Sequence, residues 1–159
     1  MAEHAESLHT VRAAGVESIP AVARLLHQFN EEFGEPSPGA RFLEERIRAL
    51  AEAGKVEALI CGERPDGFAL VQFQETIWSV KPNCYLAELY VVPDRRGDGR
   101  GRALMDAVLE AAHGRGADHI DLNTSDDDRA ARGLYESLGF TNREGSRDGP
   151  RMLYYERDL

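Results

Sequence analysis

Three glycines and four arginines crowd a single turn, in the stretch Arg95–Arg102 that reads RRGDGRGR. An apolar, β-prone run ends just before this turn at Val92, and helical apolar spacing starts directly after it. Glycine is a poor helix former, so its repetition at a helix start needs a reason. Free N–H groups and the dipole at a helix N-terminus attract negative charge, and glycines let a ligand approach the backbone. The turn therefore predicts a phosphate or pyrophosphate site that Arg96, Arg100 and Arg102 reinforce.

Two better-known phosphate-binding patterns do not fit this turn. A Walker A loop ends in Gly-Lys-Ser/Thr, which is absent here. A dinucleotide fingerprint runs G-x-G-x-x-G in the first βα unit of a domain. Here Gly97, Gly99 and Gly101 alternate, and they lie far into the chain. The alternative to an anion site is a tight turn with surface arginines and no ligand.

The elements that must position this turn follow from the apolar periodicity. Strands are expected where apolar residues alternate or run together, and helices where they recur every three or four residues. Glycine and proline separate these segments. The expected elements are strand Leu8–Ala13, helix Ile19–Phe33, a short helix over Phe42–Leu50 that ends near Gly54, strands Val56–Gly62 and Phe68–Glu75 joined as a hairpin through Pro65–Gly67, strand Tyr85–Val92, helix Arg100–His113, a strand over Ile120–Leu122, a helix over Ala130–Leu138, and two closing strands from Phe140 onward and over Met152–Glu156.

The order of these elements describes one α/β (α+β) domain over residues 1–159 with a mixed sheet. The net charge of −9 argues against nucleic acid as the main partner. No apolar run approaches the roughly 20 residues that span a bilayer, so no membrane partner is expected. The first residues lack the apolar segment of an export signal, which predicts a cytoplasmic location. Cys61 and Cys84 lack metal-ligand spacing, so we expect half-buried thiols in strands and no metal.

Two separated motifs resemble those of the GNAT superfamily of N-acetyltransferases. The turn matches the family's R/Q-x-x-G-x-G/A pyrophosphate loop at Arg96, Gly99 and Gly101. The segment DRAARGLYESLGF is similar to the family's N-x-x-A-x-x-L-Y-x-x-x-G-F motif, matched at Ala131, Leu134, Tyr135, Gly139 and Phe140. The resemblance is strong from Leu86 to Phe140 and rests on element order before that. It implies a mostly antiparallel mixed sheet whose central strands splay apart, flanked by helices.

This resemblance implies acetyl-CoA as cosubstrate. Its pyrophosphate is expected on the backbone of the glycine-arginine turn, and its pantetheine arm is expected beside the strand before the turn. Asp128 stands where the family often has asparagine, and a carboxylate accepts hydrogen bonds but donates none. The implied cofactor-binding residues are Leu89, Tyr90, Val91, Arg96, Gly97, Asp98, Gly99, Arg100, Gly101, Arg102, Asp128, Ala131 and Tyr135.

The implied reaction is direct transfer of an acetyl group to a primary amine. Such an amine, with a pKa near 10 by analogy with lysine at ~10.4, must lose a proton before it attacks, and a carboxylate can accept that proton. Glu88 is the candidate base, because strict alternation places it on one strand face with Leu86, Tyr90 and Val92. The alternative is that Glu88 pairs with an arginine or caps a neighbouring element. A backbone N–H near Val91 is the candidate oxyanion donor, and Tyr135 is the candidate acid for the departing thiolate. A role for Tyr135 in packing is the alternative.

The acceptor side carries a weaker signal. In the family the first two helices, their connecting loop and loops at strand ends build the acceptor pocket. Carboxylates beside aromatic rings can hold a cationic amine, although acidic residues are often only a solvated face. A small-molecule amine is the favoured acceptor, with a protein or peptide amine and a non-catalytic acyl-CoA sensor as alternatives, and a homodimer is a candidate assembly. The candidate acceptor residues are Phe29, Glu32, Phe33 and Trp78.

Overall fold

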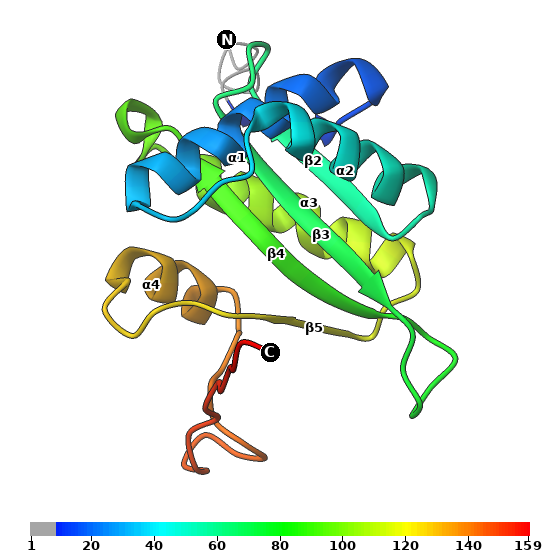
Figure 1. The fold of residues 1–159 in the computed structure, drawn as a ribbon. Helices are drawn as coiled ribbons and strands as arrows, with labels where there is room; N and C mark the ends of the chain where they lie inside the picture. The colour runs from blue at the N-terminus through cyan, green and yellow to red at the C-terminus, as the bar shows by residue number, and fades with distance from the viewer. Residues whose placement is uncertain (1–8) are drawn as a thin grey trace, which may run out of the picture. The chain divides into compact units, whose positions relative to one another are not determined.

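A five-stranded sheet lies at the centre of the computed structural model, which describes residues 9–159. The chain divides into two compact units, one ending at Leu122 and the other spanning Asn123–Leu159. The sheet belongs to the first unit. Its strands follow chain order across the sheet (Figure 1): β1 (Val11–Ala13), β2 (Val56–Cys61), β3 (Gly67–Gln74), β4 (Asn83–Val91) and β5 (His119–Leu122).

The strand pairing gives a mixed sheet. Strands β1 to β4 pair antiparallel, and β4 pairs parallel with β5. The turn through Asp66 and Gly67 closes the β2–β3 hairpin, as the sequence predicts, because turn residues there separate two apolar runs. The predicted mixed, mostly antiparallel sheet is confirmed. The first strand is shorter than predicted, and Leu8 lies outside the described residues.

Helices cover both faces of this sheet (Figure 1). On one face, residues of α1 (Ile19–Phe33) and α2 (Ala40–Glu52) form a single core cluster with alternate residues of β2 and β3. The opposite face carries α3 (Arg100–Gly114), where Leu104, Met105 and Val108 are fully buried. All three helices begin and end within two residues of the predicted bounds. The prediction succeeds because the apolar stripe of each helix, which the sequence shows, is the face that packs against the sheet.

A β-bulge interrupts β4 at Ala87. Leu86 pairs with Val71 and Glu88 pairs with Leu70, so Ala87 has no partner on β3. Leu70 belongs to the core beneath α1 and α2, whereas Val71 faces the other side of the sheet. Glu88 therefore shares a face with Tyr90, but Leu86 does not. The expectation that strict alternation places Leu86 with Glu88 is wrong, because one extra residue reverses the alternation.

The second unit holds α4 (Arg129–Ser137), which begins and ends one residue before the predicted bounds. Asp128 caps this helix, accepting a hydrogen bond of 3.0 Å from the Ala131 N–H. The two predicted closing strands are wrong: among residues 9–159 this region has only a single β-bridge, between Arg143 and Arg151. The side chains that follow, from Met152 to Tyr155, are exposed, so no buried face fixes the register of a hairpin.

Candidate active site

The glycine-arginine turn leads into α3 through two residues in left-handed conformations. Gly97 has φ of 83° and Gly99 has φ of 96°, values that other residue types rarely adopt. Within residues 9–159, the backbone N–H groups of Gly97, Asp98, Gly99 and Gly101 have no hydrogen-bond acceptor. Neighbouring unpaired N–H groups at a helix start are the donor set that a pyrophosphate requires. The turn therefore fits the anion site that the sequence predicts.

Two of the three predicted arginine side chains are bound to carboxylates. Arg100 is 4% exposed, and its guanidinium contacts both Asp66, at 3.1 Å, and Asp98. Arg96 forms two 2.9 Å contacts with the carboxylate of Glu32. An anion bound at this turn would therefore rely on backbone N–H groups more than the sequence suggests, and the contribution of Arg102 stays a prediction. The sequence marks Asp66 only as a residue of the predicted hairpin turn, and gives no sign that it binds Arg100.

Strand β4 loses one of its two neighbours halfway along its length. Its pairing with β5 extends from Asn83 to Leu86, whose partner Leu122 is the last residue of β5. Pairing with β3 continues to Val91. Beyond the bulge, the backbone of Leu89, Tyr90 and Val91 has a neighbouring strand on one side only among the described residues. An extended arm can pair with backbone left open in this way.

Glu88 lies on this half-open part of β4 and is partly buried. Among residues 9–159, no hydrogen bond or ion pair to its carboxylate is found, so no arginine partner supports the structural alternative. Burial raises the pKa of Glu88 above its ordinary value. A carboxylate in such surroundings accepts a proton more readily than an exposed one.

Next to Glu88 on the same face, Tyr90 anchors a polar and aromatic cluster. Its hydroxyl donates to Glu32 at 2.7 Å, and its ring stacks on Phe29 with 4.9 Å between centroids. Phe29 in turn contacts Phe33 edge-on, at 5.2 Å. The hydrogen bond from Arg96 lowers the pKa of Glu32, whereas burial and the Glu32 hydrogen bond raise the pKa of Tyr90 to about 12. The structure thus brings together three of the four predicted acceptor residues.

Trp78, the fourth, lies elsewhere. It is 90% exposed in the loop between β3 and β4, next to the Asn83 end of β4. Tyr90 lies near the opposite end of the strand, roughly 23 Å from Asn83 at about 3.3 Å per residue. The structure does not bring Trp78 to the acceptor cluster.

Tyr135 and Asp128 belong to the second unit. Tyr135 is buried, with its ring 5.9 Å from that of Phe140. Burial, and to a smaller degree the nearby Asp128 carboxylate, raise the pKa of Tyr135 to about 12. The hydroxyl therefore keeps its proton at neutral pH and can act as a donor. One carboxylate oxygen of Asp128 caps α4, and its role toward a cofactor stays a prediction.

The two cysteines do not offer a nucleophile. Both thiols lie in strands as predicted, but they are fully buried rather than half-buried. Burial raises the pKa of Cys61, and it raises that of Cys84 to about 11, so both stay protonated at neutral pH. In the described part of the chain, no group of three or more His, Cys, Asp or Glu side chains could hold a metal ion. No helix there is long and apolar enough to cross a membrane.

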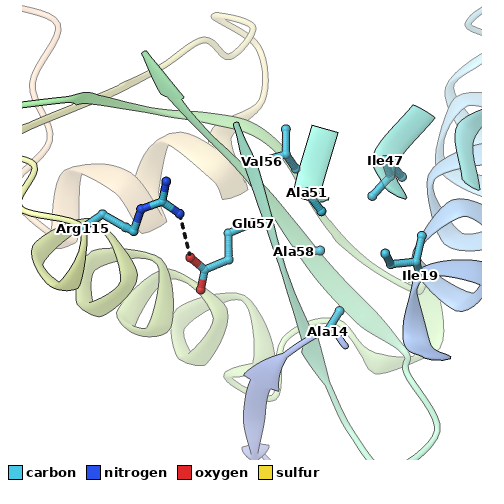
Figure 2. Close-up of a pocket in the computed structure, with 8 residues that line it drawn as sticks. All are labelled: Ala14, Ile19, Ile47, Ala51, Val56, Glu57, Ala58 and Arg115. Atoms are coloured by element: carbon cyan, nitrogen blue, oxygen red, sulfur yellow. Dashed lines mark ion pairs between the residues drawn. The ribbon is translucent and has the colours of Figure 1, made fainter. Parts of the chain in front are cut away.

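A pocket of about 240 Å³ lies beside β2, away from the residues described above (Figure 2). Its polar lining consists of Glu57 and Arg115, an ion pair at 3.9 Å, and none of the predicted site residues borders it. The apolar lining residues are Ala14, Ile19, Ile47, Ala51, Val56 and Ala58. The pocket is therefore separate from the candidate active site.

Known proteins resemble this chain over most of its length. It is 31% identical to an uncharacterized N-acetyltransferase, YhfO of Bacillus subtilis, over 137 residues that cover 85% of this chain and 91% of the relative. A crystal structure of an acetyltransferase from Arthrobacter sp. FB24 is 38% identical, with a TM-score of 0.88, and the match covers 99% of this chain and 100% of the other.

A shorter match links the chain to a larger enzyme. It is 38% identical to mycothiol acetyltransferase of Beutenbergia cavernae over 69 residues, which are 42% of this chain but 23% of that protein. The chain thus spans about a quarter of this relative. The model of the acetyltransferase (GNAT) family matches residues 20–140. On these matches, with the sheet and the turn described above, the chain belongs to the GNAT family of N-acetyltransferases that use acetyl-CoA.

Proposed function

We propose that this chain transfers an acetyl group from acetyl-CoA directly to a primary amine of a small molecule. The observation that carries the proposal is the second half of β4. There Glu88, whose carboxylate has no partner among residues 9–159, lies on backbone that β5 does not pair with, and the strand ends in a turn whose N–H groups lack acceptors within the same residues. The match to mycothiol acetyltransferase supports a small-molecule acceptor.

In this proposal, backbone groups make most of the contacts with acetyl-CoA. The N–H groups of Gly97, Asp98, Gly99 and Gly101 hold the pyrophosphate, and the open backbone of Leu89 to Val91 orients the pantetheine arm. Acetyl-CoA supplies the acetyl group on a thioester. Asp128 and Ala131 are included among the proposed cofactor contacts only through the family motif to which they belong.

The chemistry then needs three groups of this chain. Glu88 accepts a proton from the ammonium form of the acceptor, so that the amine nitrogen can form a bond to the acetyl carbon. A backbone N–H near Val91 donates to the negative charge that develops on the carbonyl oxygen. As the carbon–sulfur bond breaks, Tyr135 donates its proton to the departing thiolate, and the second proton that the nitrogen loses on becoming an amide restores the tyrosine hydroxyl.

Calorimetry with acetyl-CoA, followed by a free-thiol assay across a panel of primary amines, tests the proposal. We expect micromolar binding and release of thiol with at least one amine. Tyr135→Phe should retain acetyl-CoA binding and lose most turnover, since the ring packing persists and only the hydroxyl is removed. Binding without turnover of any amine would favour a sensor over an enzyme, and absence of binding would refute the assignment of the turn.

A further inference from the structure

The acceptor cluster contains a carboxylate whose charge is already balanced. Glu32 contacts Arg96 through both of its oxygens, each at 2.9 Å, and accepts the Tyr90 hydroxyl at 2.7 Å. A two-point arginine–carboxylate contact is geometrically specific and stronger than a single hydrogen bond. The Glu32 side chain is 27% exposed and the Arg96 side chain 41%, so the pair lies at the surface of the cluster, where an acceptor can approach it.

Arg96 is itself fixed by two further contacts. Its Nε donates to the Val91 carbonyl at 2.8 Å, and its guanidinium lies over the Tyr90 ring, 5.4 Å from the centroid. All of these groups lie in the first unit, on the last residues of α1 and β4 and the turn between β4 and α3. The guanidinium is therefore held at the acceptor cluster by four contacts with three residues of this chain, Glu32, Val91 and Tyr90.

Exposed aromatic surface lies beside this cluster, and one carboxylate on the same strand face has no ionic partner among the described residues. Phe33 is 58% exposed and stands edge-on to Phe29, which stacks on Tyr90. Glu88, two residues along β4 from Tyr90 and roughly 7 Å away, is the nearest carboxylate along the strand without a partner among the described residues. A second cationic group on the acceptor could bind Glu32 only by displacing Arg96 from its carboxylate.

From this arrangement we infer that Arg96 determines acceptor specificity: by neutralising Glu32 it selects monoamines that carry an aromatic or apolar group and disfavours linear polyamines. This inference rests on the proposed function and names the substrate class of the same site. The reacting amine meets Glu88, and its carrier group packs on the rings of Phe29 and Phe33. A polyamine loses the solvation of its second ammonium group without gaining a free carboxylate.

The test compares two probe amines, phenethylamine and 1,4-diaminobutane, in four proteins: wild type, Arg96→Gln, Glu32→Gln and the double variant. Amine binding is measured by calorimetry and kcat/KM by the free-thiol assay. Wild type should prefer phenethylamine. Arg96→Gln releases the Glu32 carboxylate, so the ratio of diamine to monoamine kcat/KM should rise about tenfold, the value of a charge-assisted contact.

The double variant should lose this gain, because no carboxylate remains to hold the second ammonium group. Arg96→Lys keeps the positive charge beside Glu32 and should keep the wild-type preference. A purely structural role for Arg96 would weaken both amines alike, would leave their ratio unchanged, and would thereby overturn the inference. A wild type that prefers the diamine, or that binds neither amine, would overturn it as well.

Acetyl-CoA binding in the same samples separates this inference from the proposed function. If wild type does not bind acetyl-CoA, the proposed function fails. If all four proteins bind it and the amine preference is the same in each, only the role of Arg96 fails. A selective loss of acetyl-CoA affinity in Arg96→Gln, with amine preference unchanged, would return the guanidinium to the cofactor and overturn the inference.

Discussion

At the Val91 end of β4, charged and aromatic side chains are tied to one another, whereas at the Asn83 end large apolar side chains project from the molecule. Tyr90 has bonded partners from α1 and from the turn before α3. Ile77, Trp78 and Val80, in the loop before Asn83, are all at least 90% exposed. Both ends carry residues that the sequence marks as candidates for binding. Only at the Val91 end are those residues brought together, because a helix and a turn converge there on the same strand.

The largest effect should follow a change in the turn itself. Gly99→Val places a β-branched residue at φ of 96°, and its Cβ would lie 3.3 Å from Nε2 of His9. We expect acetyl-CoA binding to fall below detection in calorimetry, since the side chain blocks backbone approach and shifts the neighbouring N–H groups.

Gly116→Val provides the matched control for that change. Gly116 has φ of 78° with no atom near its Cβ position, and it lies at the other end of α3. It should show the same kind of backbone strain, about 1–3 kcal/mol, with acetyl-CoA binding retained. Equal loss of binding in both variants would indicate general destabilisation and not a specific anion site.

A smaller effect, on turnover rather than binding, should follow Glu88→Gln. We expect kcat to fall by about 10²-fold or more, the usual contribution of a general base, with acetyl-CoA affinity retained. In wild type the rate should rise as Glu88 loses its proton, with a midpoint above the ordinary glutamate pKa of 4.5, and this limb should be absent from the variant. Glu110→Gln, on the exposed face of α3, is the control that should leave the profile unchanged.

The stability of Glu88→Gln gives a second test of the environment of Glu88. Because burial raises the pKa of Glu88 in the folded state, the folded protein holds this proton more tightly than the unfolded chain. Protonated Glu88 therefore stabilises the folded protein below the pKa that this group has in the unfolded chain. This contribution is lost as the pH rises through the pKa of Glu88 in the folded protein. Glu88→Gln should unfold at a higher denaturant concentration than wild type at neutral pH. A destabilised variant would instead indicate a structural partner for Glu88.

The smallest effect belongs to the opposite end of β4. Trp78→Ala removes a side chain that is almost fully exposed, so its free energy of unfolding should change by less than about 0.5 kcal/mol. KM for the acceptor should equal that of wild type, because Trp78 is remote from the cluster around Tyr90. A raised KM would assign Trp78 to the acceptor site after all, and would remove the contrast between the two ends.

Local sequence patterns predict the order and nature of the elements as far as α4, and they predict the tight glycine turn before α3. Apolar periodicity is a local property, and burial of an apolar stripe needs no particular partner, so α1, α2 and α3 appear where the spacing predicts them. Gly97 and Gly99 likewise adopt left-handed backbone because their own chemistry permits it. The capping role of Asp128 is also local, three residues before the N–H that it accepts.

Only the tertiary structure decided which charges are free. The distance in sequence between Arg96 and Glu32, or between Arg100 and Asp66, gives no sign that these groups meet. The bulge at Ala87 depends on how β3 and β4 align, and it reverses the alternation that a single strand would predict. The two predicted closing strands do not form for the same reason, since the apolar residues of the second, from Met152 to Tyr155, stay exposed. Pairing, register and charge balance are decided between segments, and a pattern within one segment does not contain them.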